Sequence, residues 1–149
     1  MRKMQASDVD EVLAIECAVQ AYPWTRGNFC DALESGYLCY VEECDGKPCG
    51  YAVLMMGSDD AELLNIAIAE AYQRKGMGRR MLESLMQIAR DKRKFRVLLE
   101  VRSSNLAAIT LYCLAGFHEI GVRRAYYRSN NGSENAIVMA CDLENRGDA

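Results

Sequence analysis

One stretch of the chain changes abruptly from one hydrophobic pattern to another. Ala61–Ala69 is rich in apolar residues and is expected to form a strand. Gln73–Gly78 is polar and contains two glycines, which is typical of a turn. Apolar residues then recur at helical spacing, which predicts a helix over Met77–Lys92. We therefore expect a strand, a glycine-containing turn and a helix in succession.

The remaining pattern predicts alternating short elements. Ser7 is expected to cap a first helix that runs to about Gln20, and Thr25 to begin a second one. Asp45-Gly46 is a hairpin turn signal, and Tyr22-Pro23-Trp24 is expected to be a loop. The further strands are expected at Lys3–Gln5, Tyr37–Glu43, Cys49–Met56, Arg96–Val101, Phe117–Tyr127 and Asn135–Leu143, with a helix at Asn105–Ala115 and a polar turn at Ser129–Ser133.

These elements predict a single α/β domain over residues 1–149, in which 144–149 form a frayed tail. Hairpin-connected strands make most of the sheet antiparallel, whereas the strand–helix–strand unit through Met77–Lys92 predicts one parallel pair. Helices are expected on both faces of this mixed sheet. The sequence contains no apolar run of the length that spans a membrane, so we expect a cytoplasmic protein.

Composition restricts the chemistry. The net charge is −3, which does not favour direct nucleic-acid binding. The seven cysteines form no Cys-x-x-Cys motif and have no histidine at ligand spacing, so no metal site is expected. Reduced thiols are the simple interpretation, although Cys44 and Cys49 flank the hairpin turn and could pair under oxidising conditions.

The turn and helix start are suited to binding an anion. Free N–H groups and the positive end of the helix dipole converge there, and a glycine lets a phosphate approach the backbone. Arg74, Lys75, Arg79 and Arg80 add positive charge. Glycine spacing alone also fits an ordinary solvated helix start, and the turn matches neither the Walker motif nor Gly-x-Gly-x-x-Gly.

Gln73-Arg74-Lys75-Gly76-Met77-Gly78 resembles the acyl-CoA pyrophosphate loop of the GCN5-related N-acetyltransferases, Gln/Arg-x-x-Gly-x-Gly/Ala. The resemblance covers roughly Met4 to Leu143. The strings Tyr22-Pro23-Trp24, Leu99–Asn105 and Ala108–Phe117 are similar to those of the bacterial members that acetylate the N-terminal alanine of a small-subunit ribosomal protein. The resemblance implies the family fold, with a parallel strand pair that splays to admit pantetheine, and acetyl-CoA as co-substrate without a metal.

Two residues are candidates for catalysis. Glu100 lies in an apolar strand, where burial would make a carboxylate a better base, but by itself the pattern favours a carboxylate in a salt bridge to Arg102 or Arg96. The resemblance favours the base. Tyr112 lies seven residues after Asn105, nearly two helical turns, so both face the same way. The resemblance implies that Tyr112 protonates the departing sulfur, whereas by itself it could be a core aromatic.

The binding residues follow from the same resemblance. It implies that the cofactor contacts the backbone of one strand, the glycine loop and a helix start, at Ile66, Ala67, Ile68, Arg74, Lys75, Gly76, Met77, Gly78, Arg79 and Asn105. It implies that the substrate contacts Tyr22, Trp24, Arg124 and Tyr126. Packing of Trp24 over the core, and a solvated final hairpin carrying Arg123, Arg124, Tyr126 and Tyr127, are the structural alternatives.

We therefore expect a monomeric N-terminal acetyltransferase in which the amine attacks the thioester directly. A small-amine acetyltransferase would share every cofactor residue. A non-catalytic module that binds acyl-CoA or RNA through the basic helix is a third possibility, against which Glu100 and Tyr112 speak. The sequence leaves the exact target peptide open.

Overall fold

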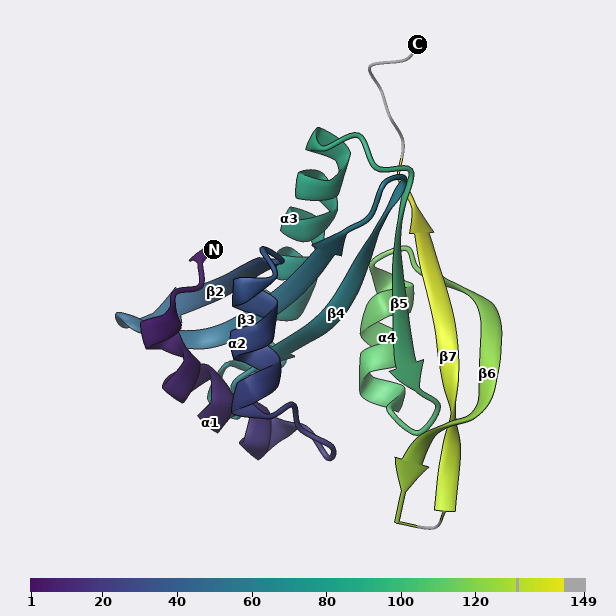
Figure 1. Ribbon diagram of the computed structural model, residues 1–149, viewed down its shortest axis with the longest axis horizontal. Helices are drawn as coiled ribbons and strands as arrows, with labels where there is room; N and C mark the ends of the chain where they lie inside the picture. The colour runs from purple at the N-terminus through teal and green to yellow at the C-terminus, as the bar shows by residue number, and fades with distance from the viewer. Residues whose placement is uncertain (131, 144–149) are drawn as a thin grey trace. The chain divides into compact units, whose positions relative to one another are not determined.

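The computed structural model describes residues 1–130 and 132–143 (Figure 1). These residues form seven strands, four α-helices and two 3-10 helices. The strands are β1 (Arg2–Lys3), β2 (Leu38–Cys44), β3 (Lys47–Met56), β4 (Asp60–Ile68), β5 (Arg96–Arg102), β6 (His118–Ser129) and β7 (Gly132–Asp142). The helices are α1 (Val9–Val19), α2 (Arg26–Glu34), α3 (Met77–Asp91) and α4 (Leu106–Leu114), with 3-10 turns at Ala6–Asp8 and Glu70–Tyr72.

The strands form one mixed sheet in the order β1-β2-β3-β4-β5-β7-β6. β4 and β5 are parallel, in a register that pairs Asp60 with Arg96 and Leu63 with Leu99. The ladders β1–β2, β2–β3, β5–β7 and β6–β7 are antiparallel. The predicted α/β class, with a mostly antiparallel sheet and one parallel pair, is confirmed.

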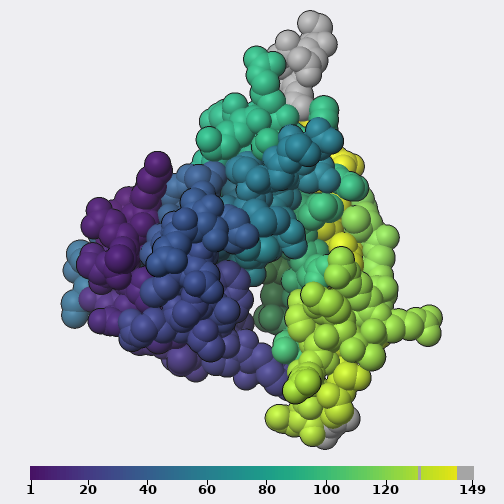
Figure 2. Space-filling view, viewed as in Figure 1, coloured from purple at the N-terminus to yellow at the C-terminus, as the bar shows by residue number. Residues whose placement is uncertain are grey.

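The chain divides into two compact units, and unit 1 comprises Met1–Met56 and Leu64–Leu82. Its core is formed where α1 and α2 cover β2 and β3, and it includes the fully buried Val12, Phe29 and Tyr51. The Phe29 and Tyr51 rings form a T-shaped pair at a centroid distance of 5.6 Å. Figure 2 shows α1 and α2 as the purple and blue surface over this unit.

Unit 2 comprises Gly57–Leu63 and Glu83–Ala149. Its central strand β5 alternates strictly, with Val97, Leu99 and Val101 buried. Because successive side chains of a strand point to opposite faces, Glu100 and Arg102 lie together on the face opposite these three residues. This alternation determines where the candidate base lies.

Several local predictions need correction. Ser7 does not cap the first helix, because Ala6–Asp8 form a 3-10 turn in which the Asp8 carboxylate accepts a hydrogen bond from the Gln5 N–H at 2.7 Å. Arg2 holds that carboxylate through both terminal nitrogens at 2.8 Å, which lowers the pKa of Asp8. The 3-10 turn at Glu70–Tyr72 was not expected.

The final hairpin has a shorter turn than expected, because β7 begins at Gly132. Residue 131 and the expected tail 144–149 lie outside the described residues. The loop at Tyr22–Trp24, the Thr25 cap and the Asp45-Gly46 turn are confirmed. Among the residues that the structure describes, no helix is long and apolar enough to cross a membrane.

Candidate active site

Two hydrogen bonds from side chains to backbone carbonyls fix the glycine loop of unit 1. Gln73 donates a hydrogen bond through Nε2 to the Ile68 carbonyl at 2.9 Å, which ties the loop to the end of β4. Arg80 donates from Nη1 to the Lys75 carbonyl at 3.1 Å. Arg74 and Gly76 both have positive φ, 63° and 79°. The backbone therefore turns sharply immediately before α3 begins at Met77.

This geometry fits a pyrophosphate. A Cβ at Gly76 would lie 3.2 Å from Arg80 Nη1 and would require a left-handed conformation that side chains rarely adopt. The Arg80 N–H donates to the Gly76 carbonyl at 3.1 Å, and the hydrogen bonds of the helix start there. The N–H groups that precede Arg80 in the first turn are therefore directed at the loop. The side chains of Arg74, Lys75 and Arg79 are exposed around it. The residues present therefore suit the anionic end of acetyl-CoA.

The strand that precedes the loop packs closely against β3. A Cβ at Gly50 would lie 3.2 Å from the Ala67 carbonyl oxygen and 2.8 Å from a methyl group of Ile68. The Ala69 N–H donates to the Cys49 carbonyl at 2.8 Å. Ala67 is buried, whereas Ile66 and Ile68 are half-buried. Close contact with β3 thus supports the three residues whose backbone is expected to bind the pantetheine arm.

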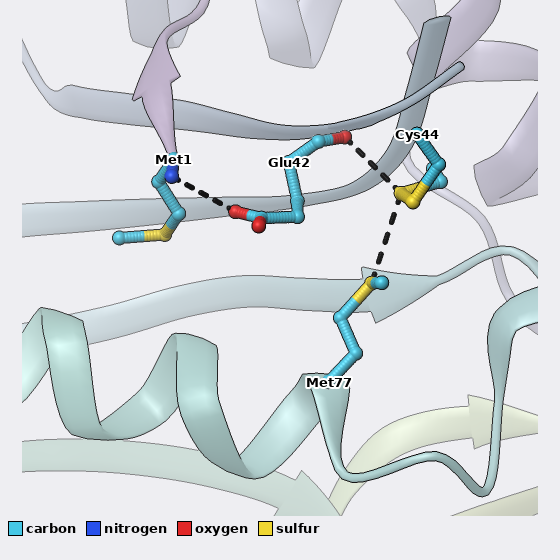
Figure 3. Close-up of a disulfide and its surroundings, with 5 residues drawn as sticks. Met1, Glu42, Cys44 and Met77 are labelled. Carbon is cyan, nitrogen blue, oxygen red and sulfur yellow. Dashed lines mark hydrogen bonds and ion pairs between the residues drawn. A yellow bond between two sulfur atoms is a disulfide. The ribbon is translucent and has the colours of Figure 1, made fainter.

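The β2–β3 hairpin carries a disulfide next to the glycine loop. Cys44 and Cys49 are bonded, with their Cα atoms 5.8 Å apart, and the Cys49 Sγ lies 3.7 Å from the Met77 Sδ (Figure 3). Glu42 of the same hairpin pairs with the N-terminal ammonium at 3.0 Å. The sequence placed the two cysteines at the hairpin turn but favoured reduced thiols. The structure instead pairs them and brings them against the first residue of α3.

Glu100 of unit 2 is largely shielded from solvent and forms an ion pair. Its side chain is 19% exposed, and its Oε1 lies 3.0 Å from Nε of Arg123. The sequence suggested Arg102 or Arg96 as the alternative partner. Arg102 pairs with Glu134 at 3.1 Å instead, and Arg96 pairs with Asp60 at 3.2 Å. β7 pairs with both β5 and β6, and this pairing brings Arg123 of β6 to the Glu100 carboxylate of β5.

Tyr112 lies on α4 in a setting that keeps its hydroxyl protonated. It is 9% exposed, and its ring packs against Phe117 at a centroid distance of 5.8 Å. Burial, and to a lesser extent the neighbouring Tyr127, raises the pKa of Tyr112 to about 12. A phenol with this pKa is a proton donor throughout the neutral range. Tyr112 is therefore a core aromatic whose hydroxyl chemistry is also compatible with a general acid.

Asn105 is the N-cap of α4, since its Oδ1 accepts a hydrogen bond from the Ala108 N–H at 3.2 Å. Capping satisfies one of the free donors at the helix start and orients the side chain. The amide nitrogen is the part of Asn105 left to meet a ligand carbonyl. The cap was not anticipated, and it gives Asn105 a structural function beside the expected one.

A buried carboxylate that sequence reasoning missed positions the Tyr22–Trp24 loop. Glu16 on α1 is 1% exposed, and its Oε2 accepts hydrogen bonds from the Trp24 N–H at 2.8 Å and from Asn65 Nδ2 at 3.1 Å. Its Oε1 accepts from the Tyr51 hydroxyl, and burial and this carboxylate raise the pKa of Tyr51. A charged residue among the apolar positions of an amphipathic helix was the available signal. Tyr22 is 39% exposed, and the Trp24 ring packs on Phe29 at 5.1 Å.

Arg124 and Tyr126 lie on a bulge of β6. The register shifts between Arg123 and Tyr127, Ala125 has a φ of 52°, and its N–H bonds Asn135 Oδ1 at 2.9 Å. Bulges redirect side chains and are frequent beside active sites. Arg124 and Tyr126 are exposed, and the Tyr126 ring meets Tyr127 edge-on at 5.1 Å. The two predicted substrate residues are therefore on an accessible, irregular stretch.

A family match defines the class of site. Among the described residues, no group of three His, Cys, Asp or Glu side chains could hold a metal ion. Residues 8–117 match the model of the acetyltransferase (GNAT) family. The chain belongs to this family and is accordingly an acetyl-CoA-dependent N-acyltransferase, as the glycine loop predicted.

Particular relatives resemble the chain over nearly its whole length. It is 37% identical over 140 residues to the [ribosomal protein bS18]-alanine N-acetyltransferase of Escherichia coli K12, covering 94% of this chain and 95% of that one. It is 36% identical over 141 residues to a putative enzyme of the same name from Bacillus subtilis, covering 93% and 92%. The crystal structure of the E. coli ribosomal-protein-S18-alanine N-acetyltransferase superposes with a TM-score of 0.88 at 36% identity, covering 95% of this chain and 92% of that chain.

Proposed function

We propose that the protein transfers an acetyl group from acetyl-CoA to the N-terminal alanine amine of ribosomal protein bS18. The similarity to the E. coli enzyme, which spans almost the entire length of both chains, carries this proposal. The strings that narrow the resemblance to that enzyme include Tyr22–Trp24 and Leu99–Asn105, which lie at the predicted peptide and catalytic positions.

The glycine loop is proposed to bind the pyrophosphate. The N–H groups of Met77 and Gly78 donate to it, and Arg74, Lys75 and Arg79 neutralise its charge. The backbone of Ile66, Ala67 and Ile68, together with Asn105, orients the pantetheine arm. Acetyl-CoA supplies an activated acetyl group as a thioester.

Glu100 and Tyr112 are proposed to move the protons. Glu100 accepts a proton from the N-terminal ammonium group, which leaves a neutral amine whose lone pair can form the new C–N bond. Tyr112 donates its hydroxyl proton where the C–S bond breaks, so that the thiolate leaves as a thiol, and the second proton of the nitrogen, released as the amide forms, restores the phenol. Trp24, held by Glu16, and Tyr22, Arg124 and Tyr126 position the peptide.

A transfer assay tests the function. The purified protein is incubated with acetyl-CoA and a synthetic peptide that carries the N-terminal sequence of bS18. Mass spectrometry is expected to show the gain of one acetyl group on the terminal amine, and none on a matched peptide whose terminal amine is blocked. Transfer to spermidine at a higher kcat/KM than to the peptide would instead identify a small-amine acetyltransferase. Absence of transfer to any amine, with intact acetyl-CoA binding, would leave a non-catalytic module.

We infer that the enzyme acts as a cytoplasmic monomer on the free N-terminal segment of its substrate and needs no nucleic acid. Size-exclusion chromatography with light scattering, and transfer rates with and without ribosomal RNA, test these two points separately.

A further inference from the structure

A second carboxylate lies beside the proposed base in unit 2. The parallel register of β4 and β5 pairs Glu62 with Leu98. Glu100 is two residues beyond Leu98, so Glu62 and Glu100 share one face of the sheet as diagonal neighbours. Both side chains are partly buried. Two carboxylates this close repel each other unless a cation lies near them.

Arg123 supplies that cation by reaching across an intervening strand. β7 lies between β5 and β6, and Ala136 on β7 is the register partner of both Arg102 and Arg123. The small side chain of Ala136 lets the Arg123 chain extend over β7 to Glu100, where Nε and Oε1 are 3.0 Å apart. Arg123 also faces the Tyr126 ring, 5.2 Å from the guanidinium carbon to the centroid.

The charge balance of this cluster is incomplete. Burial raises the pKa of Glu62, the Glu100 charge raises it further, and Arg123 opposes both. Among the described residues, Arg102 on β5, Tyr127 on β6 and Glu134 on β7 also lie near the cluster. Arg102 bonds Glu134 at 3.1 Å and the Arg128 carbonyl at 2.8 Å, and it stacks on Tyr127 at 4.3 Å. The named groups are the three carboxylates of Glu62, Glu100 and Glu134 and the two guanidiniums of Arg102 and Arg123, so their formal charges sum to −1.

We propose that Glu62 and Glu100 form a binding site for a primary ammonium group, and that Arg123 occupies this site in the free protein until the substrate's N-terminal ammonium displaces it. This inference rests on the proposed function. On binding, the N–H bond breaks and the proton moves to a Glu100 oxygen, while Glu62 accepts a hydrogen bond from the resulting amine. Arg123 moves towards the Tyr126 ring, where a cation is also favourable.

The displacement is energetically accessible. The Arg123 side chain is 57% exposed, whereas Glu100 is 19% exposed. Ion pairs with one solvated partner contribute little net free energy, so a better-fitting cation can replace Arg123. Specificity for a charged terminal amine then arises from the carboxylate pair, and Arg123 keeps other cations out of the site.

Steady-state kinetics with the bS18 peptide test the site. Arg123→Gln removes the competing cation, so KM for the peptide should fall by roughly 3- to 10-fold, with kcat nearly unchanged. The acid limb of kcat/KM should move to higher pH, because the lost cation no longer lowers the pKa of Glu62. Glu62→Gln should raise KM by about 10-fold. The control is Arg128→Gln, which removes an exposed charge from the same strand and should change neither value.

A rise of KM in Arg123→Gln would overturn the inference, because it would make Arg123 a direct contact of the substrate. A Glu62→Gln variant that matches Arg128→Gln in KM and in pH profile would overturn it as well.

A binding measurement separates this inference from the proposed function. Carbon-13 NMR of the glutamate carboxyl groups is recorded without acetyl-CoA while alanine amide is added. The Glu62 and Glu100 signals should shift together at lower amide concentration in Arg123→Gln than in the wild type, and N-acetylalanine amide should shift neither. Missing shifts alongside normal peptide turnover would refute the ammonium site alone, whereas shifts without turnover of any peptide would refute the proposed function alone.

Discussion

Replacing Glu16 with alanine is expected to loosen the Trp24 loop and destabilise unit 1. The carboxylate is 1% exposed and accepts hydrogen bonds from three donors on three separate segments: the Trp24 N–H, Asn65 Nδ2 and the Tyr51 hydroxyl. Alanine would leave these donors facing a cavity. Tyr51 is fully buried, so its hydroxyl has no access to water in place of Glu16.

The magnitude follows from two of the three donors, the Tyr51 hydroxyl and the Trp24 N–H. An unsatisfied buried donor costs about 1–3 kcal/mol, so losing the partner of the Tyr51 hydroxyl and the Trp24 N–H should lower the free energy of unfolding by roughly 2–6 kcal/mol. That is a large part of the 5–15 kcal/mol typical of a domain. Tyr51→Phe removes a single bond to a charged group and should cost about 1.5–3 kcal/mol.

Trp24 is the only tryptophan, so its fluorescence reports on the loop directly. Urea unfolding followed by fluorescence gives the free energy of unfolding for the wild type, Glu16→Ala and Tyr51→Phe. The matched control is Glu11→Ala, which removes an exposed carboxylate from the same helix and should change stability by less than about 0.5 kcal/mol. The reasoning is refuted if Glu16→Ala unfolds at the same urea concentration as Glu11→Ala, with an unchanged emission maximum.

Further predictions concern the cofactor loop, the two catalytic candidates and the disulfide. Gly76→Val should weaken acetyl-CoA binding far more than peptide binding, because a branched side chain is strained at a φ of 79° and blocks the pyrophosphate. Calorimetry on the folded variant measures the affinity for acetyl-CoA, and an unchanged affinity would contradict the prediction. Glu100→Gln should slow turnover by roughly 100- to 10,000-fold at neutral pH. The difference in rate from the wild type should shrink as rising pH deprotonates the amine. A near-normal rate across pH 6 to 9 in a folded variant would exclude Glu100 as the base. Tyr112→Phe should lower kcat with little change in KM, because the raised pKa of Tyr112 keeps its hydroxyl a proton donor from pH 6 to 9. Full activity of the variant would show that Tyr112 is a core aromatic only. Replacing Cys44 and Cys49 together with serine should lower the free energy of unfolding under non-reducing conditions by about 2 kcal/mol, the entropic value for so short a loop, and the difference should vanish in a reductant.

Local signals determined most of the fold. The glycine pair, the Thr25 cap, the Asp45-Gly46 turn and the helical spacing after Met77 each depend on a few neighbouring residues, so their elements could be recognised in the sequence. The parallel pair β4–β5 followed from the handedness and length of one strand–helix–strand unit. Element ends shifted by one to three residues, because capping and register are decided by contacts such as the Arg2–Asp8 pair that replaced Ser7.

Part of the candidate site could likewise be recognised in the sequence, and part only in the structure. The sequence by itself determined the glycine loop proposed to bind the pyrophosphate, since conformation, charge and backbone donors there are all local, and it singled out Glu100 and Tyr112 as candidates through a family resemblance. Only the tertiary structure decided the partners: Arg123 reaches Glu100 across β7, and Glu16 joins Trp24, Tyr51 and Asn65. Contacts between residues so distant along the chain produce no periodic pattern in the sequence. The pairing of strands and burial against a sheet depend on the whole packed core rather than on neighbouring residues.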